Sequence, residues 1–79
     1  MKVLYFASAQ GLANLKSESM RLEEGSSLEN LAAEMLRLHP DLKSIEPTIR
    51  YSINFEIAKG NARLHNGDEV AVLPPVAGG

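Results

Sequence analysis

One segment of this chain has the period of an amphipathic helix, and it lies between segments that alternate or run apolar as strands do. The apolar positions of this segment recur at helical spacing: Leu28, Leu31, Ala32, Met35 and either Leu36 or Leu38. A lone helix must bury its apolar face against another element, and the flanking strands offer only a sheet. The pattern therefore predicts an α+β fold, with one main helix packed on one face of a sheet.

Capping residues predict where this helix begins and ends. Ser26 with Glu29 matches the capping box S-x-x-E, and Ser27 is an equally good N-cap. Pro40 disfavours a helical conformation at His39, so the helix is expected to stop there.

Two nearly continuous apolar runs, residues 2–8 and 69–73, predict the first and last strands. Because these are the most apolar runs, we expect them to lie side by side at the centre of the sheet. Residues 16–23 and 48–57 alternate and predict two further strands, the second of which has room to continue past a kink into a short additional one. Residues 9–15 are expected to form a loop with at most one helical turn.

Composition limits the classes of function. The 79 residues predict one domain, and the absence of cysteine excludes disulfides, a cysteine nucleophile and a thiolate metal site. The net charge is −2 with the two signs interspersed, which argues against binding to nucleic acid. No apolar run approaches a membrane span, and residues 1–9 do not resemble a signal peptide. We therefore expect a cytoplasmic protein that does not bind membranes.

No constellation of side chains predicts a self-contained enzyme. His39 and His65 lie near turns without spaced acidic partners, so a surface or capping role is expected and no metal site. Asp68 is expected to serve the turn before the last strand.

The last six residues form the most distinctive feature of the chain: Pro74, Pro75, Val76, Ala77, Gly78 and Gly79. The prolines end the preceding strand and make the chain leave it extended and stiff. Gly78 and Gly79 would become ordered only in a partner's channel too narrow for a Cβ. We expect a domain over residues 1–73 and an extended, flexible tail over 74–79, whose reactive group is the carboxylate of Gly79.

An interface with a partner is expected around the base of this tail. Tyr5 and Phe6 must face opposite sides of the first strand, so one of them is available away from the helix. The residues assigned to partner binding are Phe6, Leu73, Pro74, Pro75, Val76 and Ala77.

Three motifs together resemble the small subunit of molybdopterin synthase, a ubiquitin-like sulfur carrier. They are Leu4-Tyr5-Phe6-Ala7, Gly67-Asp68-Glu69-Val70 before the last strand, and the Pro-Pro-x-x-Gly-Gly ending. The resemblance spans the chain and implies a β-grasp (ubiquitin-like) roll with a mixed sheet of four to five strands.

The resemblance also implies an activity cycle. An ATP-dependent enzyme would adenylate Gly79, and a sulfur donor such as a cysteine desulfurase system would convert the adenylate to a thiocarboxylate. The large subunit, in a heterotetramer of two small and two large chains, would pass this sulfur to cyclic pyranopterin monophosphate to build the molybdopterin dithiolene. The chain itself would bind no cofactor.

One departure and three alternatives accompany this interpretation. Many relatives have an Arg-Glu pair where this chain has Ala9-Gln10-Gly11. A sulfur carrier for thiamine biosynthesis and a ubiquitin-like protein modifier would use the same Gly-Gly end. A plain β-grasp binding module would not need the tail.

Overall fold

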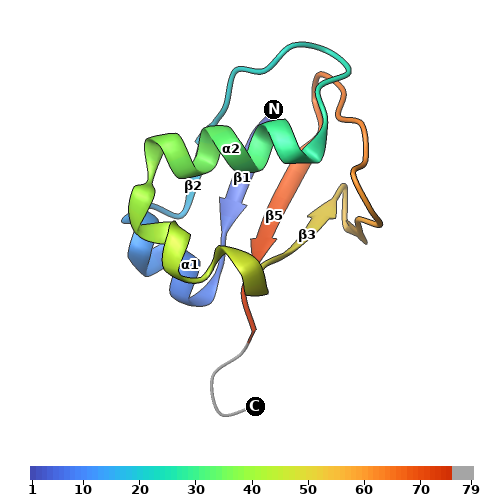
Figure 1. Ribbon diagram of the computed structural model, residues 1–79. Coiled ribbons are helices and arrows are strands. Elements are labelled where there is room, and N and C mark those ends of the chain that lie inside the picture. Colours follow the sequence, from blue (N-terminus) through green and yellow to red (C-terminus); the bar gives the residue numbers. More distant parts are fainter. Residues whose placement is uncertain (76–79) are drawn as a thin grey trace.

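The computed structural model describes residues 1–75 as a five-stranded mixed sheet with its helices on one face (Figure 1). The elements in chain order are β1 (Lys2–Tyr5), α1 (Ala7–Ala13), β2 (Ser17–Ser19), α2 (Leu28–Leu38), the short 3₁₀ helices η1 (Pro40–Ser44) and η2 (Glu46–Thr48), β3 (Arg50–Ile53), β4 (Glu56–Ile57) and β5 (Glu69–Leu73). This is the predicted α+β class and a β-grasp arrangement.

The first and last strands lie together at the centre of the sheet, as predicted. The strand order is β2-β1-β5-β3-β4, and β1 runs parallel to β5 with Val3 opposite Val70 and Tyr5 opposite Val72. β5 is antiparallel to β3 on its other side. The C-terminal ends of β1 and β5 therefore meet at one edge, which sets Phe6 beside the point where the tail begins.

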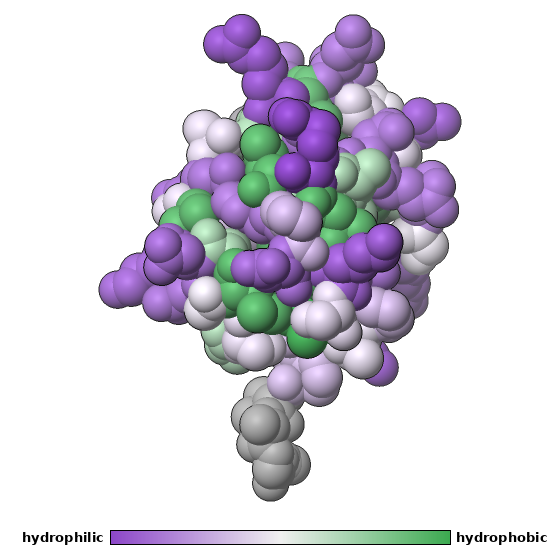
Figure 2. All heavy atoms as spheres, turned by 60° about the vertical axis from the view of Figure 1, so that its left-hand side comes forward, coloured by the Kyte–Doolittle hydropathy of each residue, from purple (hydrophilic) through white to green (hydrophobic). Residues whose placement is uncertain are grey.

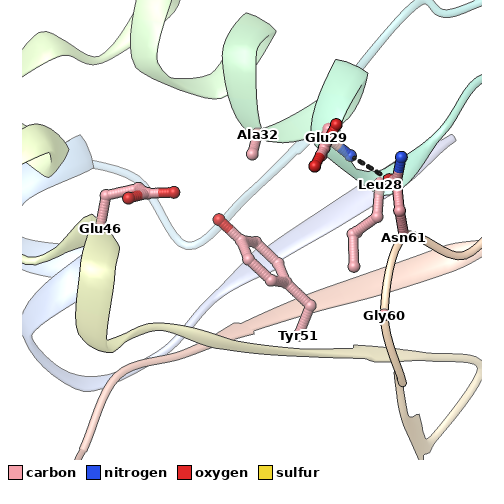
Figure 3. Close-up of a pocket in the computed structure, with 7 residues that line it drawn as sticks. All are labelled: Leu28, Glu29, Ala32, Glu46, Tyr51, Gly60 and Asn61. Atoms are coloured by element: carbon pink, nitrogen blue, oxygen red, sulfur yellow. Dashed lines mark hydrogen bonds between the residues drawn. The ribbon is translucent and has the colours of Figure 1, made fainter.

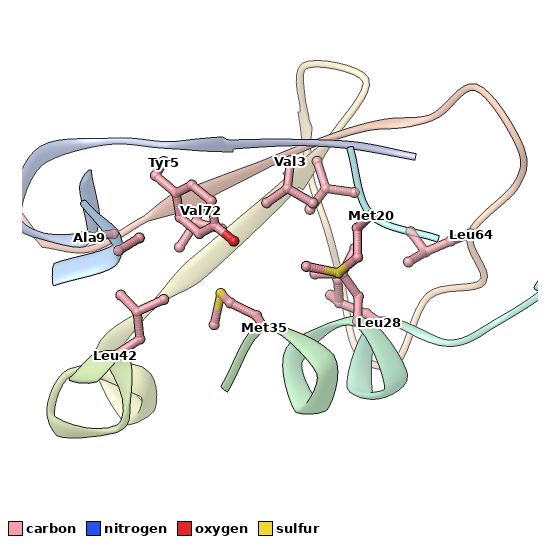
Figure 4. Close-up of a cluster of buried hydrophobic side chains, with 12 residues drawn as sticks. Val3, Tyr5, Ala9, Met20, Leu28, Met35, Leu42, Leu64 and Val72 are labelled. Atoms are coloured by element: carbon pink, nitrogen blue, oxygen red, sulfur yellow. The ribbon is translucent and has the colours of Figure 1, made fainter. Parts of the chain in front are cut away.

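The core lies between this sheet and α2 (Figure 4). Alternate strand residues, among them Val3, Tyr5, Val70 and Val72, face Leu31 and Met35 of the helix and are buried. Other buried members come from the connections and close the ends of this layer: Ala9, Ala13, Met20, Leu42 and Leu64.

The structure decides between Ser26 and Ser27, the two residues that the sequence offered as the N-cap of α2. Ser27 is the N-cap: its Oγ accepts from Asn30 N at 3.1 Å, and Asn30 Oδ1 accepts from Ser27 N at 3.0 Å. The Ser26–Glu29 box is wrong, because the Ser26 carbonyl accepts from Leu64 N and keeps this residue paired with a distant segment. His39 is the C-cap, which confirms the expected capping role.

Residues 7–13 form a helix. The predicted strand over 2–8 therefore ends early, at Tyr5, and the prediction of a loop with at most one turn over 9–15 is wrong. Ala9 and Ala13 are buried on the inner side of α1, while a side chain at Gly11 would meet open space. Gly11 therefore lowers only the intrinsic helix propensity, by about 1 kcal/mol relative to Ala, and burial of the alanines outweighs this. Asn14 ends the helix in the left-handed conformation, at φ 59°.

The alternating stretch 48–57 is interrupted twice. Thr48 belongs to η2, and Asn54 and Phe55 have φ of +50° and +72°, the signature of a two-residue hairpin turn between β3 and β4. Asn54 is fixed there because its Oδ1 accepts from Glu69 N and its Nδ2 donates to Asp68. The predicted strand at 16–23 is likewise shorter, since only Ser17–Ser19 pair with β1.

A partly buried polar cluster joins the C-terminal end of α2 to β1 and β2. Glu18 Oε2 accepts from the hydroxyl of Tyr5 and lies 2.6 Å from His39 Nε2. The rings of Tyr5 and His39 meet edge to face with centroids 5.6 Å apart. Burial, and secondarily Glu18, raise the pKa of Tyr5, so its hydroxyl remains a donor.

We predict that Ser27→Ala lowers the free energy of unfolding by about 1 kcal/mol, because the mutation leaves Asn30 N without its acceptor at the start of α2. Ser26→Ala is the matched control and should change stability by less than about half of that. Urea denaturation followed by circular dichroism measures both. Equal losses in the two variants would contradict the assignment of the cap.

We also predict that His65 titrates above the ordinary histidine pKa, because its Nδ1 is hydrogen-bonded to the Glu24 carboxylate. A raised folded-state pKa stabilises the fold below the unfolded value, and this contribution is lost as pH rises through the folded value. An NMR titration should show the pKa falling in Glu24→Gln and unchanged in Glu23→Gln. An equal His65 pKa in wild type and Glu24→Gln would refute the pairing of His65 with Glu24.

Candidate functional site

The candidate site begins where β5 ends. Leu73 is half-buried, Pro74 is buried and Pro75 is exposed, so Pro75 is the proline that faces solvent. Val76, Ala77, Gly78 and Gly79, which carry the remaining site predictions, lie outside the described residues. β5 holds the start of this segment rigidly, because it is hydrogen-bonded to a strand on each side.

An apolar groove lies on the sheet face opposite α2, next to the end of β5. We call it the sheet groove; its lining consists of Leu4, Phe6, Ser52, Phe55, Ile57, Glu69, Ala71 and Leu73, and its volume is about 290 Å³. It arises because Val3, Tyr5, Val70 and Val72 point toward the helix, so their neighbours Leu4, Ala71 and Leu73 must point the other way. Small Ala71 leaves the space between them.

Large apolar side chains at the rim of the groove remain in contact with solvent. Phe55 is 88% exposed, Ile57 is 55% exposed and Phe6 is 45% exposed. Clustered exposed apolar residues on a small monomer mark an interaction site, whereas single ones need no explanation. The sheet groove is therefore a candidate docking surface, and it adjoins the base of the tail.

The sequence prediction identified part of this surface. Phe6 and Leu73 were expected there, and the structure brings them into one groove. The short additional strand that the sequence allowed after a kink is present as β4, but Phe55 and Ile57 were not assigned to the interface. Asn54 was the available signal, since asparagine favours the left-handed conformation that this turn requires.

The sheet groove offers binding rather than acid–base chemistry. Glu69 is the single ionisable residue in its lining. Across residues 1–75, no group of three or more His, Cys, Asp or Glu side chains is arranged to hold a metal ion.

Other faces are more mixed. On the face shown in Figure 2, hydrophilic side chains separate the hydrophobic ones into small patches. In the part of the chain that the structure describes, no helix is long and apolar enough to cross a membrane.

The segment in which this chain lacks the Arg-Glu pair of many relatives lies in α1. Of Ala9-Gln10-Gly11, Ala9 is fully buried in the core, so only Gln10 and Gly11 present atoms to a partner. Both line an open surface depression with Ala7, Asn14, Leu15 and Lys16.

Comparison with curated proteins finds sulfur carriers of the same length. The chain is 36% identical to a molybdopterin synthase sulfur carrier subunit from Chlamydomonas reinhardtii, over 100% of this chain and 98% of the relative. It is 30% identical to a protein of the same name from Mycobacterium tuberculosis, over 100% of this chain and 96% of the relative.

Solved structures share the fold. SAMP1 from Haloferax volcanii matches with a TM-score of 0.88 at 23% identity, over 99% of this chain and 97% of that one. A chain from the complex of subunits 1 and 2 of the molybdopterin-converting factor of Helicobacter pylori matches with a TM-score of 0.72 at 24% identity, over 99% and 96% of the two chains. At these identities the matches establish the β-grasp fold.

The family comparison covers nearly the whole sequence, including the part of the tail beyond Pro75. The model of the ThiS family matches residues 3–79. With this match and the full-length similarity to sulfur carrier subunits, the chain belongs to the ThiS family.

Proposed function

We propose that this protein is the sulfur carrier subunit of a molybdopterin synthase. The observation that carries the proposal is the full-length match to sulfur carrier subunits, combined with a central strand that delivers the chain to a Pro-Pro-x-x-Gly-Gly ending. The relatives are named as sulfur carrier subunits of molybdopterin synthase. The proposed activity needs a tail on a rigid base, and β5 supplies that base.

The proposed chemistry takes place on the carboxylate of Gly79. A carboxylate is a poor electrophile, so an ATP-dependent partner would join it to AMP as a mixed anhydride and release pyrophosphate. The terminal sulfur of a persulfide, supplied by a sulfur donor such as a cysteine desulfurase system, would then displace AMP. A thiol would cleave the resulting acyl disulfide, which releases the thiocarboxylate and leaves the donor side as a disulfide. The sulfur of this soft nucleophile would attack cyclic pyranopterin monophosphate in the large subunit, and water would then cleave the thioester that joins it to Gly79 and restore the carboxylate. Two such transfers would supply the two sulfurs of the molybdopterin dithiolene.

This chain would contribute the reacting group and the surfaces through which its partners bind it. The sheet groove, together with Leu73, Pro75, Val76 and Ala77, would dock on the large subunit and direct Gly78 and Gly79 into its active site. The Helicobacter pylori structure, a complex of subunits 1 and 2, supports a large-subunit partner of this kind. The proposal includes a heterotetramer of two small and two large chains, no cofactor bound by this chain, and a cytoplasmic location.

Adenylation tests the proposal directly. With the adenylating enzyme, the full chain should support exchange of labelled pyrophosphate into ATP, because the mixed anhydride forms reversibly. A variant that lacks Gly78 and Gly79 should lose this exchange while its thermal unfolding is unchanged. Exchange that is equal with and without these glycines would exclude Gly79 as the site.

Docking through the sheet groove gives a second prediction. Phe55→Ala should weaken binding to the large subunit about 10- to 30-fold in calorimetry, as expected for truncation of an aromatic anchor worth about 2 kcal/mol. Leu38→Ala is the matched control, because Leu38 is 41% exposed but lies on α2. Both variants should fold. Equal affinity of Phe55→Ala and wild type would remove the groove from the interface.

A further inference from the structure

A second pocket lies in the helical layer, between α2 and β3 and behind the sheet as seen from the sheet groove. We call it the helix pocket; its lining consists of Leu28, Glu29, Ala32, Glu46, Tyr51, Gly60 and Asn61 (Figure 3). Its volume is about 330 Å³ and it is open to solvent. None of the roles proposed above uses it.

The hydroxyl of Tyr51 points into this pocket. Figure 3 shows it directed toward Ala32 and toward the side where the Glu46 carboxylate lies. The oxygen is buried, and among residues 1–75 it has no hydrogen-bond partner. A buried polar atom without a protein partner is costly and uncommon, so this hydroxyl is available to a hydrogen-bonding group that enters the pocket. Burial, and secondarily the Glu46 charge, raise the pKa of Tyr51 to about 12, so the phenol stays neutral and its oxygen can accept.

The charges around the pocket indicate which kind of group it can bind. Glu29 and Glu46 are both carboxylates, and within residues 1–75 neither takes part in an ion pair. No lysine or arginine is part of the lining. Leu28 and Ala32 supply an apolar wall beside these acceptors. An aliphatic stem that ends in a cationic hydrogen-bond donor matches both features, and lysine and arginine side chains have this composition.

The open shape of the pocket favours a side chain that a docked protein presents over a free amine. A small cation would remain largely hydrated here and would lose its translational freedom for few contacts. A side chain on a protein that is already held by other contacts avoids most of that cost.

We propose that the helix pocket receives a lysine or arginine side chain of a protein that docks on this carrier, with the stem against Leu28 and Ala32 and the head between Glu46 and the Tyr51 hydroxyl. The identity of the partner rests on the proposed function, since the candidates are the large subunit and the adenylating enzyme. The chemistry of the pocket does not.

The chemistry is tested with a small probe. Because a free cation binds this pocket only weakly, the NMR titration of the full chain is carried to a large excess of probe. N-acetyl-arginine amide should then shift the amide signals of Leu28, Ala32 and Gly60, and its neutral isostere N-acetyl-citrulline amide should not. Glu46→Gln should abolish this response, and Glu23→Gln, which removes an exposed carboxylate outside the pocket, should keep it. Equal shifts with both probes, or shifts that survive Glu46→Gln, would overturn the proposal.

The partner is tested by calorimetry with the large subunit and with the adenylating enzyme. Glu46→Gln and Tyr51→Phe should each weaken binding to at least one of them about three- to tenfold, while Glu23→Gln matches wild type. Affinities unchanged for both partners would refute the proposal. If the wild-type chain binds neither partner, the proposed function fails, and the probe titration still decides whether the pocket accepts a cationic side chain.

Discussion

The parallel pairing of β1 with β5 is the interaction on which the rest of this structure depends. It joins the two most apolar segments of the chain, which are separated by nearly its whole length, and buries Val3, Tyr5, Val70 and Val72 against α2. It also fixes what lies on the outer face, because the alternate residues of the same two strands form the floor of the sheet groove. The core, the sheet groove and the base of the tail are therefore consequences of one strand register.

This register separates binding from chemistry. The described residues provide a groove with one ionisable group and no metal-binding cluster, while the reactive carboxylate of the proposed carrier lies at the end of a tail that β5 directs. Such a division suits a protein that binds several partners in turn, since each partner can dock on the folded domain and act on the tail. The helix pocket adds an electrostatic contact on a different surface from the apolar groove.

Much of this architecture could be predicted because apolar runs and helical period report burial directly. The central strands, the main helix and the opposite orientations of Tyr5 and Phe6 followed from that signal. The errors came where tertiary contacts decide between local alternatives. Ser26 was excluded as the cap by a hydrogen bond to Leu64, and α1 forms despite Gly11 because its alanines are buried.

The sheet groove shows that prediction of the site from the sequence also failed where tertiary structure decides. Alternation in 48–57 was real but crossed a turn, so the side chains after Asn54 lie on a returning strand, and Phe55 is exposed. The helix pocket was beyond prediction from the sequence, because it brings Tyr51, Glu46 and Leu28 together from three separate elements. Asn54 is a local signal for the turn beside the sheet groove, whereas no local motif marks the helix pocket.

The central claim, that Gly79 carries sulfur, is tested most directly by the mass of the C-terminal fragment after incubation with ATP, the adenylating enzyme and a sulfur donor. Fragmentation is needed because oxidation of Met1, Met20 or Met35 adds nearly the same nominal mass as exchange of oxygen for sulfur. The account predicts that this mass increase is confined to Gly79. A fragment that stays unmodified with all three components active would contradict it.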